Sequence, residues 1–147
     1  MIDLAAHFVA SLLTGFFFWV VFARENKKIL LWCLFFGLLT GLFVDLDHLF
    51  DYFVAYGGHW NFQHFIHEDY LNLSGYNYNF VFLHDFELVF LLGLIAIFLK
   101  NKEKRIFFGI MATSLFLHLT IDIVIGSGGA RNYFLIYRIL TGFRTLT

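Results

Sequence analysis

Histidine and carboxylate residues recur at helical spacing inside otherwise apolar stretches of this sequence. His118 and Asp122 are four residues apart, and Asp45 and His48 are three residues apart, so each pair shares one face of a helix. Imidazole and carboxylate side chains without a neighbouring thiolate are typical ligands of Zn²⁺, Mn²⁺ or Fe. The spacing therefore indicates metal chemistry, provided that the fold brings the separate pairs together.

The composition places these residues in a lipid bilayer. Of the 147 residues, 60% are hydrophobic and only 14% are charged, with 22 Phe and no Pro. A soluble domain of this length leaves too much of its surface in water to carry so many apolar side chains. The formal net charge of −1 gives no reason to expect nucleic acid as a partner, and the single cysteine excludes an intramolecular disulfide. Membrane lipid is the expected partner.

Four apolar stretches are long enough, or nearly long enough, to cross roughly 30 Å of hydrocarbon. We therefore predict an all-α, polytopic membrane protein with a single domain, 1–147, built as a four-helix transmembrane bundle. The predicted spans are 2–23, 29–50, 80–99 and 106–125, and residues 51–79 form a long outer loop. A short interfacial helix is expected within 132–143, with Arg138 extending toward water.

The positive charges predict how the bundle is oriented. Seven of the ten Lys and Arg residues lie on two short connections, which four alternating spans place on the same side of the membrane. The positive-inside rule assigns that side to the cytoplasm. The N-terminus and the long loop then face outward, and we expect a bacterial-type inner membrane. The seven residues are Arg24, Lys27, Lys28, Lys100, Lys102, Lys104 and Arg105.

Antiparallel spans would bring ionisable residues from all four helices to one depth, near the outer face. A charged side chain inside a membrane costs a few kcal/mol or more unless it is paired, so such residues usually mark a site. Each span carries them near its outer end, within roughly two helical turns of a common level. They are His7 in the first span, Asp45, Asp47 and His48 in the second, His84, Asp85 and Glu87 in the third, and His118 and Asp122 in the fourth.

Some of these residues are also compatible with a supporting role. Asp45 and Asp47 point to different sides of a continuous helix, so we expect one of them to orient a ligating imidazole instead of binding metal. His7 taken alone is equally compatible with a hydrogen-bonded packing role. The histidines of the outer loop are expected to be solvated or packed, and not to be ligands; they are His59, His64 and His67.

Four short motifs resemble a known family. They are a His in the first span, G-L-F-V-D-L-D-H at 41–48, H-D-x-E at 84–87 and H-L-T-I-D-I-V-I-G-S-G-G at 118–129. Their order is similar to that in the YdjM-type family, whose members are described as membrane-bound metal-dependent hydrolases. The resemblance implies that the metal is bound by His7, Asp45 or Asp47, His48, His84, His118 and Asp122.

The leading functional expectation is a membrane-embedded hydrolase that acts on a lipid-like or interfacial ester or phosphoester. One or two divalent ions, with Zn²⁺ preferred to Mn²⁺ or Fe, would activate water. Glu87 or Asp47 would be the catalytic base, and Glu87 is preferred to Asp85 because it shares a helix face with His84. Two rivals stay open: a b-type haem electron-transfer protein with histidine axial ligands, and a His/Asp pathway for ions or protons.

Overall fold

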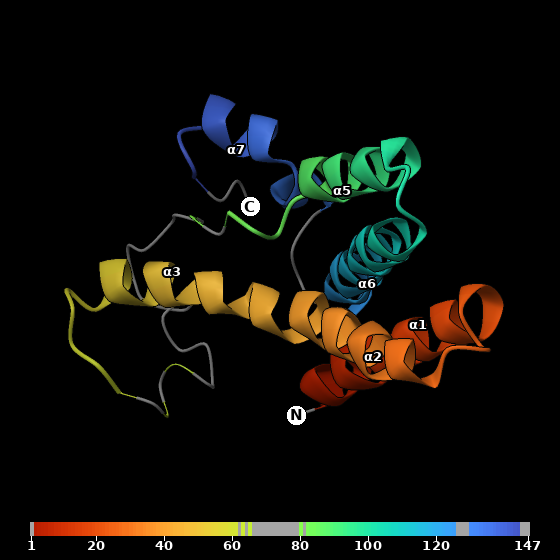
Figure 1. The fold of residues 1–147 in the computed structure, drawn as a ribbon. Coiled ribbons are helices and arrows are strands. Elements are labelled where there is room, and N and C mark those ends of the chain that lie inside the picture. The colour runs from red at the N-terminus through yellow and green to blue at the C-terminus, as the bar shows by residue number, and fades with distance from the viewer. Residues whose placement is uncertain are drawn as a thin grey trace.

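Every regular element in the described part of the chain is a helix, as the sequence predicts. The structure is a computed structural model, and it describes residues 2–61, 63, 65, 80, 82–125 and 130–144 (Figure 1). The helices are α1 (Ile2–Phe22), α2 (Lys27–Leu42), the 3₁₀ helix η1 (Phe43–Asp47), α3 (His48–Ala55), α5 (Phe86–Phe98), α6 (Lys102–Ile125), the 3₁₀ helix η3 (Ala130–Tyr133) and α7 (Leu135–Leu140).

Three helical rods are long and apolar enough to cross a membrane. They are Ala5–Phe22 in α1, Lys27–Ala55 through α2, η1 and α3, and Lys102–Ile125, which is α6. The fourth apolar helix, α5, has only 13 residues, which cover about 20 Å at about 1.5 Å per residue. It begins at Phe86, whereas the sequence predicts a span from residue 80. The chain is therefore an integral membrane protein whose described residues form three full-length rods and one short apolar helix.

Helix α6 is the centre of the packing. The pair formed by α1 and α2 contacts one side of α6, and α5 contacts another side (Figure 1). Glycines allow α1 and α2 to approach each other backbone to backbone: a Cβ atom at Gly15 would lie 2.5 Å from the carbonyl oxygen of Cys33, and one at Gly37 would lie 2.5 Å from that of Ser11. Small residues at such crossings are what membrane helices use to pack closely.

The second rod changes from an α-helix to a 3₁₀ helix at the residues that carry the predicted D-x-D-H motif. From Phe43 to Asp47 the chain is a 3₁₀ helix, which has about three residues per turn instead of 3.6. Asp45 and His48 are three residues apart and therefore stay in line. Asp47 is offset from Asp45 by about a third of a turn, so the two carboxylates can reach one side chain from two directions.

Two aspartates hold the non-helical segment that leads into α5. The Phe80 backbone N–H donates to Asp51 Oδ1 at 2.8 Å, and the Leu83 backbone N–H donates to Asp47 Oδ2 at 2.6 Å. A backbone donor left unpaired in a bilayer costs several kcal/mol, so irregular backbone there needs such partners. These two contacts explain why the segment can stay out of the helix, and they direct His84 towards η1.

Candidate metal centre

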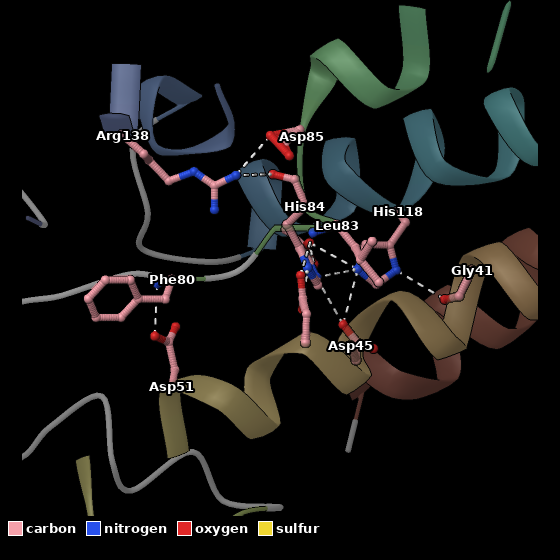
Figure 2. A network of polar contacts seen from close by, with 11 residues as sticks. Gly41, Asp45, Asp51, Phe80, Leu83, His84, Asp85, His118 and Arg138 are labelled. Carbon is pink, nitrogen blue, oxygen red and sulfur yellow. Dashed lines mark hydrogen bonds and ion pairs between the residues drawn. The ribbon is translucent and has the colours of Figure 1, made fainter. Parts of the chain in front are cut away.

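Three donor atoms from three different segments form the compact centre of the site. His84 Nε2 lies 3.1 Å from His118 Nε2 and 3.1 Å from Asp45 Oδ1, and His118 Nε2 lies 3.2 Å from the same Asp45 oxygen (Figure 2). Metal–ligand bonds of 2.0–2.2 Å place neighbouring ligand atoms about 2.8–3.6 Å apart in tetrahedral or octahedral geometry. The three observed separations fall within that range, so these atoms could occupy one face of a single ion.

Asp122 extends the centre towards the first helix. Its Oδ2 atom lies 3.2 Å from His118 Nε2 and 4.0 Å from His84 Nε2, and its Oδ1 atom lies 2.9 Å from His7 Nε2. The rings of His7 and His118 are stacked, with centroids 4.0 Å apart. Asp122 thus stands beside both histidines of the centre and connects them to His7.

All six residues predicted as metal ligands come together in the structure. Two groups of three each have donor atoms within 4.8 Å of one another, and they meet at the contact between His84 and His118. The His48 ring packs edge-on against that of His84, with centroids 4.7 Å apart. These buried or half-buried groups could hold a metal ion; they are His7, His118 and Asp122, and Asp45, His48 and His84.

Both central imidazoles are oriented by a partner on their other nitrogen. His118 Nδ1 lies 3.0 Å from the Gly41 carbonyl oxygen, which can only accept, so this nitrogen carries the proton. His84 Nδ1 lies 3.0 Å from Asp47 Oδ1. Each ring therefore presents Nε2 to the centre, in the arrangement by which outer residues orient metal-binding histidines. Asp47 is the carboxylate of the Asp45–Asp47 pair that orients an imidazole.

The electrostatics of the centre suit a cation. Two carboxylates flank the His84 ring: Asp45 Oδ1 lies 3.1 Å from its Nε2 atom and Asp47 Oδ1 lies 3.0 Å from its Nδ1 atom. A proton on His84 thus compensates the two carboxylates when no other cation is present, and a divalent ion can take over this role. The side chains of His84 and His118 are 3% and 1% exposed, whereas that of Asp45 is 40% exposed. The centre is therefore open at Asp45.

Glu87 and Arg138 lie elsewhere than the sequence suggests. The Glu87 carboxylate accepts hydrogen bonds from the backbone N–H groups of Leu135 at 3.1 Å and Ile136 at 3.2 Å, so it caps the start of α7. Arg138 does not extend toward water: it is 2% exposed, and its Nη2 atom donates to Asp85 Oδ1 at 2.8 Å. The expectation of a water-facing Arg138 is wrong, because a buried carboxylate beside His84 holds the guanidinium inside.

Sequence reasoning missed two supporting contacts of the site. The Gly41 carbonyl that orients His118 has no side-chain signal, and only the period of the helix could have placed it. Arg138 does have a signal, because it is a lone cation in the apolar run of α7. Of the loop histidines, His59 is exposed and His64 and His67 fall outside the described residues.

Comparison with known proteins identified no relative of this chain. No protein-family model, no curated protein and no solved structure matches the chain. The function therefore has to be argued from the geometry of the site.

Proposed function

We propose that the protein is a membrane-embedded, metal-dependent hydrolase acting on a lipid-like ester or phosphoester. The observation that carries the proposal is the compact set of His84 Nε2, His118 Nε2 and Asp45 Oδ1. The Nδ1 atom of each ring contacts an oxygen that orients the ring. Asp45 Oδ1 lies within 3.2 Å of both imidazole nitrogens, so the three donor atoms form a closed triangle around one point, as ligands of one ion do. The resemblance of the His and Asp motifs to the YdjM-type family agrees with this proposal.

In this proposal the chain supplies an ion-binding face and a proton acceptor. His84, His118 and Asp45 would hold the ion, for which Zn²⁺ is our first choice because a mixed nitrogen and oxygen set with an open position suits it. Bound there, Zn²⁺ would supply Lewis acidity and lower the pKa of a water molecule. Asp122 is the group of the centre farthest from His84, at 4.0 Å, and its other oxygen contacts His7. We therefore propose that the Asp122 carboxylate accepts the proton of the water molecule, and that His7 stabilises Asp122 after this transfer.

This assignment differs from the sequence-based choice of Glu87 or Asp47 as the base. The Glu87 carboxylate is bound to the backbone of α7, and the two oxygens of Asp47 are bound to His84 and to the Leu83 N–H. A general base must be within hydrogen-bond reach of the water that it deprotonates. Asp122 lies in the centre itself, whereas Asp47 stands behind an imidazole.

The surroundings of the open side favour a lipid substrate. Asp45 is the exposed member of the centre, and it lies between Phe43, which is 51% exposed, and Leu46, which is 50% exposed. Apolar side chains beside an opening in a membrane protein favour acyl chains over soluble substrates. With the basic loops in the cytoplasm, the centre would act on the outer leaflet of a bacterial-type inner membrane.

The spacing of the imidazoles favours a bare metal ion over haem. Two axial nitrogens on opposite sides of one iron would lie roughly 4 Å apart, given bonds of about 2 Å. The two central nitrogens are 3.1 Å apart, and carboxylate oxygens lie beside both. A His/Asp pathway for ions or protons needs no such compact face, and the experiment below distinguishes it.

The test is metal analysis and an absorption spectrum of detergent-purified protein. We expect one or two equivalents of Zn, Mn or Fe and no Soret band, loss of the metal in a His118→Ala, Asp122→Ala double variant, and metal-dependent hydrolysis of phospholipid or ester substrates. His59→Ala is the matched control, because this histidine is exposed and lies outside both ligand groups. Equal metal content in the double variant, or proton transport in liposomes without metal, would overturn the proposal.

A further inference from the structure

Two hollows of the described chain lie at the opposite end of the bundle from the candidate metal centre. One has a volume of about 420 Å³ and lies between the α1–α2 connection and the start of α6. The other, here called the slot, has a volume of about 250 Å³ and lies between α1, α5 and α6. The two hollows share Phe22, Lys102 and Ile106 as a common wall. Neither is used by the proposed hydrolase.

The interior of the slot is apolar. Phe18, Ala96, Ile97 and Gly109 line it together with two residues of the common wall, Phe22 and Ile106. Ile97 is 71% exposed, so the slot opens where a lipid chain can enter. The slot lies where α5 packs on α6 beside α1, and the Phe18 ring packs against Gly109 on its wall: a Cβ atom at Gly109 would lie 2.9 Å from Phe18 Cε1.

The mouth of the slot carries two positive charges. Lys102 and Arg105 line it, and no carboxylate does. None of the ion pairs found among the described residues involves Lys102 or Arg105, and two carboxylates, Glu25 and Glu103, line the neighbouring hollow. Both residues stand at the end of a membrane rod, where headgroups meet water. Basic side chains at that level attract anionic lipids.

We propose that the slot binds one anionic phospholipid, with an acyl chain between α1 and α5 and the phosphate against Lys102 and Arg105. The neighbouring hollow, lined by Arg24, Glu25 and Asn26 among others, would accommodate the polar part of the headgroup. Arg24, Lys102 and Arg105 outnumber the two carboxylates that line the hollows, Glu25 and Glu103, so the net positive charge favours a lipid with net negative charge over a zwitterionic one. The site is therefore selective for net negative charge, and it does not depend on the hydrolase proposal.

The test measures lipid binding to the purified full chain in detergent, by native mass spectrometry and calorimetric titration. Phosphatidylglycerol should bind at one saturable site, and phosphatidylcholine at least tenfold more weakly. Each basic residue near an anionic lipid contributes roughly fivefold in affinity, so Lys102→Gln with Arg105→Gln should weaken phosphatidylglycerol binding about 25-fold. Ile97→Trp, which places a larger side chain at the opening of the slot, should weaken it as well.

A charge-matched control separates this site from the general attraction of a basic loop. Lys100→Gln with Lys104→Gln removes the same charge from neighbouring positions that line neither hollow. This control should change the affinity less than threefold. Equal losses in the two double variants, or equal binding of phosphatidylcholine, would overturn the proposal. Displacement of the lipid by inorganic phosphate at equal concentration would also overturn it, since a phosphate site needs no acyl chain.

Discussion

Replacing Asp47 separates a role in holding the metal from a role in the chemistry. Its Oδ1 atom lies 3.0 Å from His84 Nδ1, its Oδ2 atom accepts the Leu83 N–H at 2.6 Å, and its side chain is only 8% exposed. Outer residues that orient a ligating histidine contribute about 10–100-fold to metal affinity, or about 1.4–2.7 kcal/mol. We expect Asp47→Asn to weaken Zn²⁺ binding about 10-fold, because an amide oxygen still accepts from His84.

Asp47→Ala removes both contacts and should approach the 100-fold limit. The assay is a competition titration of the purified protein against a chromophoric Zn²⁺ chelator, with the thermal midpoint measured in parallel. Asp51→Asn is the matched control: Asp51 is a buried carboxylate of the same rod and holds the same segment through the Phe80 N–H, but it belongs to neither ligand group. Its Zn²⁺ affinity should stay within about threefold of that of the unmodified protein.

Three results would contradict this reasoning. Unchanged Zn²⁺ affinity in Asp47→Ala would mean that His84 does not need the carboxylate behind it. Complete loss of Zn²⁺ would make Asp47 a direct ligand, contrary to its position on the far nitrogen of His84. Full Zn²⁺ affinity with no hydrolysis would return Asp47 to the catalytic role that its sequence motif suggests.

Three further predictions concern the supports of the site. Glu87→Gln weakens the hydrogen bonds that hold the start of α7, so it should speed tryptic cleavage after Arg138 and leave the Zn²⁺ affinity unchanged. Loss of hydrolysis with an unaltered cleavage rate would instead favour a catalytic Glu87. Asp85→Asn leaves a buried guanidinium without its charged partner and should lower the free energy of unfolding by about 3–5 kcal/mol. Adding Arg138→Met should recover part of that loss. No change in stability would contradict a structural ion pair. Gly41→Ala places a Cβ atom against Ser11 Oγ and should cost about 1–3 kcal/mol, seen as a lower thermal midpoint, whereas an unchanged midpoint would mean that the helices can separate freely.

The convergence of the candidate metal ligands follows from the sequence because few alternatives exist. Apolar spans of limiting length must alternate in direction, so polar residues near their outer ends reach one depth whatever the details of packing. His7, His118 and Asp122 lie on α-helices of regular period, and their predicted neighbourhood is the one observed. Regular helices, in short, were enough to bring these three residues together.

The remaining features depend on departures from the α-helix. The 3₁₀ period of η1 lets Asp45 and Asp47 approach the two nitrogens of one ring, whereas a continuous α-helix separates them. Glu87 binds the backbone of α7, which is distant in sequence, so its three-residue spacing from His84 does not predict its position in the structure. Such contacts follow from tertiary packing, which local periodicity does not encode.

The shortness of α5 has a consequence for the membrane around it. Its 13 residues cover about 20 Å of a hydrocarbon layer roughly 30 Å thick. A bilayer adapts to such hydrophobic mismatch by thinning locally, at a fraction of a kcal/mol per Å. Because His84 stands directly before α5, thinning on that side draws the headgroup layer towards the metal centre. For the proposed hydrolase, this would bring the ester bond of a lipid to the candidate centre without lifting the lipid out of its leaflet.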